Sequence, residues 1–467
     1  MTLTILSDEQ VNTILESLTV EELDEFRKDL SSALHEFSTG VKAPEEAFQQ
    51  PPRATTVHHE TQVKTHYMAA CGPTGMGCKV VSRLQLESPS SPGAARPIIA
   101  NGVLTLFNPD GSPLGLVHPS ALTAFRTALA SACLLNRRNH VKTITVFGSG
   151  MQAYWHVRLA LMMRGSTIRH VNVINRRFSS NAAGLLKKFA TIPQHIKQRE
   201  GWTEAQFGLL TPTFHEYQRL LKEQIREADV IYCCTPSQED LFDGSILTSH
   251  EGRKKGRLIV AVGSHGAHMR ELPDDLIQLA VKHYDRPHRH FHKHAQEGGV
   301  IVVDNLEGAL KEAGEIIMGK VTPHQLVELG ELVMLHRLAQ EESDAEVSSQ
   351  ASIASDLDTL DINDRVPSMS TVFSPSNSTR SRSRSSSPAG STGSDPRKSS
   401  SMFHLRKNSS SSSDAEKRKK EDGLARWLRD GTVIYKSVGL GLMDLVVGIH
   451  ILKVAEDKKI GTCVEGF

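Results

Sequence analysis

The sequence predicts an α/β fold with a parallel sheet of doubly wound type. Residues 142–147 form a short apolar run typical of a buried strand, and a Gly-rich turn and an amphipathic helix to Arg164 follow at once. Residues 171–174 then have the pattern of a second strand. A strand–turn–helix–strand order implies that the two strands run parallel. Further buried-strand candidates lie downstream, at 230–234, 258–262 and 300–303.

The N-terminal part predicts two capped helices followed by strands. Ser7 and Gln10 have capping-box spacing ahead of a first set of apolar positions, and Thr19 and Glu22 repeat that spacing ahead of a second. Between about residues 55 and 116 the pattern becomes strand-like, with Gly and Pro between the runs. Helical spacing returns at 120–135 and again at 439–453.

Residues 340–422 have a different composition. Ser dominates, Arg and Lys are interspersed, and apolar residues almost vanish. Such a segment cannot bury enough apolar surface to offset its ordering entropy, so we predict a disordered Ser-rich insertion. Serines beside arginines or proline, such as Ser387 before Pro388, suit kinases. The insertion is therefore either a phosphoregulated kinase target or a plain spacer.

Composition excludes several classes of partner. The 467 residues include 54 Lys and Arg against 53 Asp and Glu, a net charge of +1, which indicates no general attraction to nucleic acid or an acidic membrane. The 6 cysteines form no C-x-x-C pair, so a disulfide framework is not expected. The acidic N-terminus lacks the pattern of a signal peptide, and no apolar run is long enough to span a membrane. We expect a cytoplasmic protein with no nucleic-acid or membrane partner.

A Gly-rich turn links the strand at 142–147 to the next helix. Its sequence is Gly148-Ser149-Gly150-Met151-Gln152-Ala153. Gly148 allows the tight turn, Gly150 lets the backbone approach a pyrophosphate, and the helix N-terminus offers free N–H groups to that anion. The alternative is a turn that merely needs glycine. The position between a strand and a helix favours a Rossmann NAD(P)-binding site.

The second predicted strand ends in Asn175-Arg176-Arg177. An acidic side chain there would accept a hydrogen bond from the ribose 2′-hydroxyl of NAD, and none is present. Two guanidinium groups instead suit a 2′-phosphate. The sequence therefore favours NADPH, with NADH still open, and a solvated basic loop is the alternative interpretation of these arginines.

A series of short motifs narrows the prediction beyond a Rossmann fold. They are L-T-A-F-R-T-A at 122–128, the Gly148–Ala153 turn, T-P-S at 235–237, M-R-E-L at 269–272, a V-D pair ending at Asp304, and Y-K-S-V-G at 435–439 followed by Asp444. In this order the motifs resemble those of the ornithine cyclodeaminase/mu-crystallin family, across roughly residues 45–455. The M-R-E-L motif is similar to the imine-reductase and crystallin branch.

The resemblance implies a set of substrate-binding residues. Arg53 and Lys79 fall where family members hold the substrate carboxylate, and Arg126 matches a position between substrate and cofactor. Lys79 and Arg126 are accordingly predicted to be catalytic. Cationic donors suit the carboxylate of an amino or imino acid, and Arg offers a fixed fork. Without the resemblance, each of these cations would be expected to be an ordinary surface charge.

The resemblance also implies the cofactor contacts and the domain organisation. The predicted dinucleotide contacts are Gly148, Ser149, Gly150, Met151, Gln152, Asn175, Arg176, Arg177, Thr235, Val262 and Ser437. A second α/β domain, assembled from both chain ends, would bind substrate and form a homodimer. The expected boundaries are 1–120 and 423–467 for that domain, 121–325 for the Rossmann domain, and 340–422 for the insertion.

One departure from the family pattern concerns the catalytic acid. Ornithine-cyclising members carry an Asp after the strand at 258–262, and His265 occupies that position here. Imidazole can move protons near neutral pH, but it does not replace a carboxylate that would stabilise a side-chain ammonium. His265 is therefore either a proton donor or a packed loop histidine. Glu271, in the M-R-E-L motif, is expected to be structural.

Three functions follow from these observations. The first is an NAD(P)H-dependent reductase of a cyclic ketimine or imino acid, such as pyrroline- or piperideine-2-carboxylate, with a place in proline or other amino-acid metabolism. The second is an ornithine cyclodeaminase that forms proline and ammonia, which the missing Asp disfavours. The third is a non-enzymatic, crystallin-like protein that binds a dinucleotide or a small carboxylated ligand, which Lys79 and Arg126 disfavour.

A dense group of histidines is the remaining signal. His283, His288, His290, His292 and His294 alternate along a short segment, and imidazole suits zinc or copper. No Cys or carboxylate accompanies them at firm ligand spacing, so a solvated basic loop is the favoured interpretation and no metal site is predicted.

Overall fold

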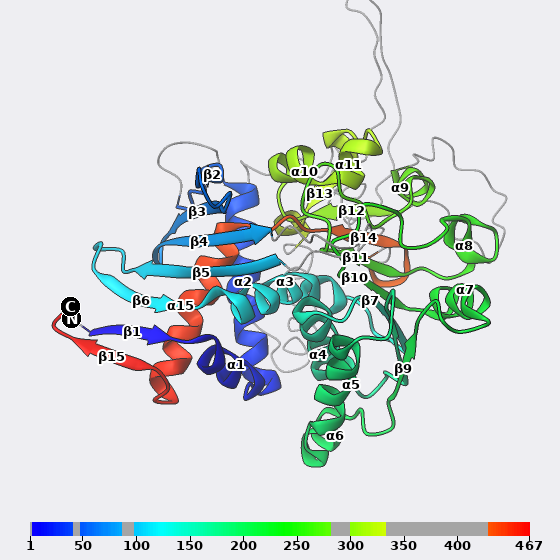
Figure 1. The fold of residues 1–467 in the computed structure, drawn as a ribbon, viewed down its shortest axis with the longest axis horizontal. Helices are drawn as coiled ribbons and strands as arrows, with labels where there is room; N and C mark the ends of the chain where they lie inside the picture. Colours follow the sequence, from blue (N-terminus) through cyan, green and yellow to red (C-terminus); the bar gives the residue numbers. More distant parts are fainter. Residues whose placement is uncertain (1, 41–46, 86–97, 282–298, 333–427) are drawn as a thin grey trace, which may run out of the picture.

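The computed structural model describes residues 2–40, 47–85, 98–281, 299–332 and 428–467 (Figure 1). Its strands form a seven-stranded mixed sheet and an eight-stranded parallel sheet. The predicted fold class is confirmed, because one sheet is built from both chain ends and the other is a Rossmann-like parallel sheet. The predicted Ser-rich insertion and the His283–His294 group lie outside the described residues.

The seven-stranded sheet has the order β15-β1-β6-β5-β4-β3-β2. Its strands are β1 Thr2–Leu6, β2 Ala54–Val57, β3 Lys64–Gly72, β4 Gly75–Gln85, β5 Ile98–Phe107, β6 Pro113–Val117 and β15 Thr462–Glu465. Strands β1 and β15 pair antiparallel, which places the two chain ends side by side (Figure 1). The sequence did not predict these two strands. Both are short, and each gains this partner only when the opposite chain end arrives.

The eight-stranded sheet has the order β13-β12-β14-β11-β10-β7-β8-β9, and every pairing in it is parallel. Its strands are β7 Thr143–Phe147, β8 His170–Ile174, β9 Gln206–Leu210, β10 Val230–Cys233, β11 Leu258–Ala261, β12 Val300–Val303, β13 Leu326–Glu328 and β14 Val433–Lys436. The central strands are buried along their whole length, as expected for a parallel sheet covered by helices on both faces.

Strand β14 enters the parallel sheet from the C-terminal part of the chain. It lies between β11 and β12. The segment assigned to the second domain in the sequence analysis is thus shared between the two sheets: β14 pairs in the parallel sheet, and β15 pairs in the other. This arrangement places Ser437, directly after β14, beside the end of β11, where the Ser437 N–H donates to Ala261 O.

Helices cover both sheets (Figure 1). They are α1 Asp8–Glu16, α2 Val20–Thr39, α3 Pro119–Leu135, α4 Met151–Arg164, α5 Ser180–Thr191, α6 Gln194–Glu200, α7 Tyr217–Glu227, α8 Ser245–Thr248, α9 Asp274–Val281, α10 Leu306–Glu312, α11 Gly314–Met318 and α15 Gly441–Asp457, with short 3₁₀ turns at Gly252–Lys254 and Pro323–Gln325. Both predicted capping boxes, at Ser7 and Thr19, are present.

Helix α3 joins the two parts of the molecule. It is almost entirely buried and packs against α1, α2 and α15 on one side and α4 on the other. One hydrophobic cluster consequently runs from Leu445 of α15 through Phe125 of α3 to Trp155 of α4. Arg126 and Thr127 of α3 therefore lie at the junction of the two sheets.

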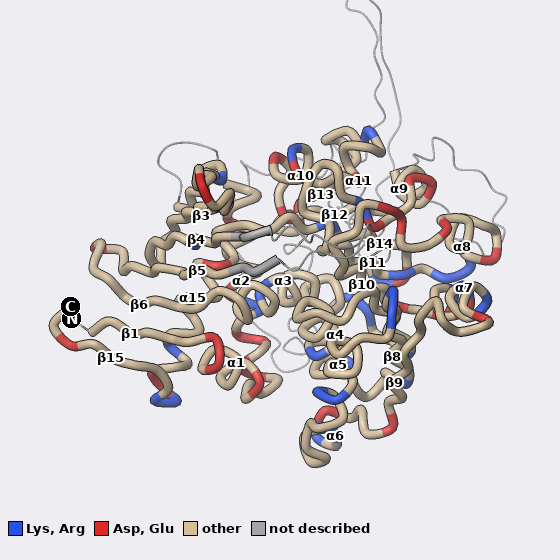
Figure 2. Tube along the Cα trace, viewed as in Figure 1, with Lys and Arg blue, Asp and Glu red and all other residues tan. Residues whose placement is uncertain are grey.

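The surface carries both signs of charge. Lys and Arg alternate with Asp and Glu over both parts of the described chain (Figure 2). All six cysteines are free. Within the described residues, no helix combines the length and the apolar character that crossing a bilayer requires.

Candidate active site

A cavity of about 390 Å³ lies where the two sheets meet. Its walls come from β3, β4 and β5, from α3 and the first turn of α4, and from the loops that follow β10, β11 and β14. Seven of the predicted site residues line it: Arg53, Lys79, Arg126, Gln152, Val262, His265 and Ser437. The structure therefore brings the predicted substrate-binding cations to the same space as part of the predicted dinucleotide site.

The centre of this site is a buried group of two cations around one carboxylate. Lys79 Nζ lies 2.5 Å from Asp444 Oδ2, and Arg126 Nε lies 3.1 Å from Asp444 Oδ1. The relative exposure of the three residues is 3%, 4% and 0%. Asp444, which was noted only as part of a motif, is thus a site residue. A single acidic residue in the first turn of the apolar helix α15 was the available signal.

Burial changes the proton affinities of this group. It lowers the pKa of Lys79 to about 8, against the opposing pull of Asp444. Burial by itself would raise the pKa of Asp444, but Arg126 and Lys79 more than offset that effect and hold it below its ordinary value. Asp444 is therefore an anion at neutral pH, and Lys79 is a cation that can release a proton close to neutrality.

A second carboxylate, that of Asp304, fixes the backbone at Val438 and Gly439, next to Arg126. Asp304, which is fully buried, accepts hydrogen bonds from Ser437 Oγ at 2.8 Å, from Val438 N at 3.0 Å and from Gly439 N at 2.6 Å. Gly439 has a φ of +87°, and a Cβ at that position would lie 2.8 Å from Arg126 Nη2. The turn that begins at Ser437 thus lies directly against the guanidinium group of Arg126.

Arg53 lies at the edge of the cavity. Its Nη1 pairs with Glu312 Oε2 of α10 at 3.1 Å, and its side chain is 24% exposed. Arg53 also lines a neighbouring cavity of about 630 Å³, which shares Met68, Val438 and Gly439 with the first. Arg53 is therefore placed at the boundary between the two spaces.

The Gly-rich turn has the geometry that a dinucleotide needs. Gly148 has a φ of +102°, and a Cβ there would lie 2.8 Å from the carbonyl oxygen of Cys234. Gly150 begins α4 without a side-chain cap, and a Cβ there would meet no atom within 4 Å. Ala153 is fully buried, as close packing of helix on strand requires. The buried Oε1 of Gln152 has no hydrogen-bond partner among the described residues. The turn fits a pyrophosphate group.

The predicted 2′-phosphate residues follow β8 on an ordered turn. Asn175 Nδ2 donates to Arg177 O at 2.9 Å, which fixes the shape of the turn. Arg176 and Arg177 are exposed, and among the described residues neither has a carboxylate partner. The two guanidinium groups are thus available to an anion, although they lie outside the cavity wall formed by Gln152 and His265.

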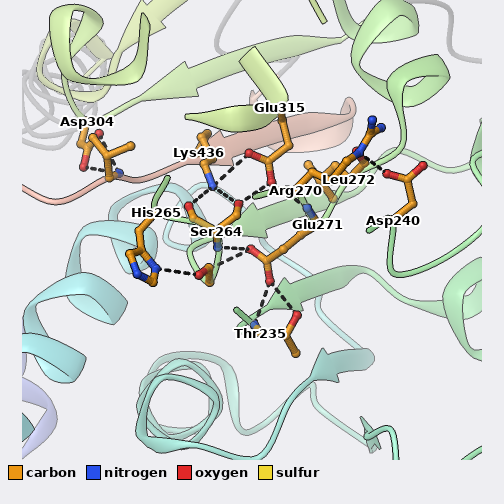
Figure 3. A network of polar contacts seen from close by, with 12 residues as sticks. Thr235, Asp240, Ser264, His265, Arg270, Glu271, Leu272, Asp304, Glu315 and Lys436 are labelled. Atoms are coloured by element: carbon orange, nitrogen blue, oxygen red, sulfur yellow. Dashed lines mark hydrogen bonds and ion pairs between the residues drawn. The ribbon is translucent and has the colours of Figure 1, made fainter. Parts of the chain in front are cut away.

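The loops after β10 and β11 complete the site (Figure 3). Thr235 donates from its N and Oγ1 to Glu271 Oε1. His265 is half-buried, and its Nδ1 lies 3.0 Å from the carbonyl oxygen of Gly263. Within the described part of the chain, no group of three or more His, Cys, Asp or Glu residues could hold a metal ion.

Comparison with known proteins gives sequence relatives and solved structures. The family model described as ornithine cyclodeaminase/mu-crystallin matches residues 8–197. A Δ1-pyrroline-2-carboxylate reductase of Bacillus cereus is 27% identical over 219 residues, covering 46% of this chain and 53% of the relative. The ketimine reductase mu-crystallin of Mus musculus is 28% identical over 232 residues, covering 49% and 57%. The chain thus spans about half the length of these curated relatives.

The fold extends the comparison to nearly the whole chain. The Δ1-pyrroline-2-carboxylate reductase of Thermococcus litoralis, solved with NADH and L-proline, superposes with a TM-score of 0.58 at 16% identity, covering 98% of this chain and 99% of the other. At that identity the likeness shows the fold alone. Over residues 8–197 the sequence is similar to the ornithine cyclodeaminase/mu-crystallin family, and the curated relatives and the fold agree with that similarity.

Proposed function

We propose that this protein is an NAD(P)H-dependent imine reductase that acts on a cyclic ketimine with a carboxylate on the imine carbon. Pyrroline-2-carboxylate and piperideine-2-carboxylate are the substrates of this class that we favour. The observation that carries the proposal is the buried group of Lys79, Arg126 and Asp444, whose two cations line the same cavity as Gln152 of the Gly-rich turn. The names of the Bacillus cereus and Mus musculus relatives support the same substrate class.

The charge of the site matches a single carboxylate. Lys79 and Arg126 contribute two positive charges, and Asp444 cancels one of them. One net positive charge is left on buried side chains, where it attracts an anion more strongly than it would at the surface. Arg126 offers a planar fork for the carboxylate, and Arg53 at the cavity edge is a further donor.

Lys79 is also the favoured proton donor to the imine nitrogen. Because its pKa is about 8, it is mostly protonated at neutral pH and yet gives up its proton readily. His265 lines the same cavity and is the second candidate donor, with a purely packed loop histidine as the alternative. A bound nicotinamide would supply the hydride, while the residues of this chain orient the substrate and exclude water.

NADPH is the proposed cofactor, with NADH as the alternative. The exposed guanidinium groups of Arg176 and Arg177 stand at the end of β8, where the adenosine ribose of a dinucleotide lies in Rossmann folds. The proposal extends to a cytoplasmic homodimer. Light scattering after gel filtration tests the dimer, and a monomeric mass at micromolar concentration would exclude it.

Two other functions fit the same site less well. Ornithine carries a distal ammonium, but among the described residues that line the 390 Å³ cavity none is Asp or Glu. A cyclodeaminase would therefore lack the carboxylate that binds the ammonium, because His265 stands in its place. A non-enzymatic binding protein would not need two buried cations, since burying charge is costly.

The test is an absorbance assay with purified protein. NADPH and NADH oxidation are followed with each imine, and ammonia release from ornithine is measured in parallel. We expect NADPH oxidation by an imine in the wild type and in Lys28→Ala, a control at an exposed lysine, and its loss in Lys79→Ala and Arg126→Ala. Ammonia release without imine reduction would favour the cyclodeaminase, and dinucleotide binding without either activity would favour the binding protein.

A further inference from the structure

The carboxylate of Glu271 connects the two loops that follow β10 and β11 (Figure 3). Its Oε1 accepts from Thr235 N at 2.8 Å and from Thr235 Oγ1 at 3.1 Å. Its Oε2 accepts from Gly263 N at 2.8 Å and from Ser264 N at 3.1 Å. Glu271 is fully buried, and four donors use the acceptor capacity of an ionised carboxylate.

Three further buried groups hold the backbone of Glu271 and of its partner Ser264 in place. The Glu271 N–H donates to Glu315 Oε1 at 2.8 Å, and the same oxygen accepts from Ser264 Oγ at 2.5 Å. Lys436 Nζ lies 3.2 Å from Glu315 Oε2, donates to Ser264 O at 2.6 Å and contacts Ser264 Oγ. None of these side chains is more than 1% exposed. The network therefore links the C-terminal ends of β10, β11 and β14 through buried hydrogen bonds.

The tied loops supply one wall of the candidate active site. Cys234 and Pro236, which flank Thr235, line the 390 Å³ cavity, and so do Val262, Gly263 and His265. Strands β10 and β11 lie on the side of β7 away from β8. Because a dinucleotide places its pyrophosphate at the turn after β7 and its adenosine toward β8, the other nucleotide half faces these loops.

We infer that Glu271 is a positioning residue for the nicotinamide half of the cofactor, with Glu315 and Lys436 holding the backbone of Glu271 and Ser264. The inference rests on the proposed function for the identity of the ligand. A carboxylate presents four acceptor sites to the loops, whereas an amide presents only two and turns an NH₂ group toward backbone N–H groups. Removal of the charge therefore loosens Thr235, Gly263 and Ser264 without touching the turn at Arg176 and Arg177.

The test compares two ligands in the full-length protein. Calorimetry measures the binding of NADPH and of adenosine 2′,5′-bisphosphate, which reports on the adenosine half alone. In Glu271→Gln we expect NADPH to bind about tenfold or more weakly while the affinity for the bisphosphate stays within about twofold. Glu223→Gln, at an exposed glutamate paired with Arg219, is the matched control and should bind both ligands as the wild type does.

Two other outcomes would overturn the inference. One is equal weakening of both ligands, which would indicate a general loss of structure, and the other is unchanged NADPH binding in a folded variant. If Glu271→Gln does not fold, Ser264→Ala replaces it. This variant removes only the hydroxyl contacts with Glu315 and Lys436, and we expect the same selective loss to a smaller extent. Imine reduction plays no part in these binding measurements, so failure of the substrate proposal and failure of this inference remain separable.

Discussion

Lys79 and Asp444 form a buried ion pair in which the lysine Nζ lies 2.5 Å from the aspartate Oδ2, with side-chain exposures of 4% and 0%. Arg126 binds the second oxygen of the same carboxylate. The three residues come from β4, α15 and α3, so that the group forms only when both chain ends have folded onto the middle of the chain. The group is thus assembled from three segments that lie far apart in the sequence.

This pair predicts the pH dependence of the reaction. Burial lowers the pKa of Lys79 to about 8, so the fraction of protonated Lys79 falls as the pH rises through that value. If Lys79 supplies the proton, kcat/KM for the imine should decline over the same range. In Asp444→Asn the attraction that raises the pKa of Lys79 is lost, and the decline should move to lower pH. An unshifted profile in that variant would assign the titration to another group, such as His265.

The contact between Gly439 and Arg126 predicts a specific loss of substrate affinity. In Gly439→Ala the new Cβ would lie 2.8 Å from Arg126 Nη2, so the guanidinium group must move. We expect KM for the imine to rise about tenfold, because a misplaced fork loses one of its two hydrogen bonds. Gly111→Ala is the control, since its φ of +85° carries the same backbone strain with no atom within 4 Å of the new Cβ. A similar KM in the two variants would show that strain alone explains the effect.

Local sequence signals predicted the strand, turn and helix around Gly148 well. The strand at 142–147, the Gly-rich turn and the helix to Arg164 correspond to β7, the turn at Gly148 and α4. These elements depend on nearest neighbours in the chain: apolar runs for strands, glycine for the positive φ, and free N–H groups at a helix start. The two N-terminal helices were predicted for the same reason, from side-chain caps three residues apart.

Such local signals do not predict pairings between residues or strands that are far apart in the sequence. Nothing in the sequence near Lys79 indicates that its partner is Asp444, or that Arg53 pairs with Glu312. The insertion of β14 between β11 and β12 is likewise a property of the whole sheet. The family motifs predicted that Arg53, Lys79 and Arg126 lie near one another, but they did not predict the carboxylates with which these cations pair.

The cofactor preference can be tested at the turn after β8. Arg176 and Arg177 are exposed and have no carboxylate partner among the described residues. The double variant Arg176→Ala/Arg177→Ala should raise KM for NADPH about tenfold to a hundredfold, because charge-assisted bonds to the 2′-phosphate are lost. KM for NADH should change little. Arg219→Ala, at an exposed arginine on α7, serves as the control. Equal changes for NADPH and NADH would argue that the 2′-phosphate binds elsewhere.

The buried histidine of α4, His156, predicts how the free energy of unfolding depends on pH. His156 is 1% exposed; its Nδ1 lies 2.8 Å from Gln152 O, and its Nε2 lies 2.9 Å from Ser131 Oγ. Burial lowers its pKa from 6.5 to about 4. The folded protein therefore holds His156 neutral, while the unfolded chain takes up a proton below about pH 6.5.

The free energy of unfolding should accordingly fall as the pH drops from about 6.5 to about 4, by up to about 3 kcal/mol from this residue. Urea unfolding at a series of pH values measures the slope. His156→Gln cannot be protonated, so it should lose stability at neutral pH but show a shallower decline on acidification than the wild type. His324→Gln, at an exposed histidine, should keep the wild-type slope. A slope that is unchanged in His156→Gln would place the acid sensitivity in other groups.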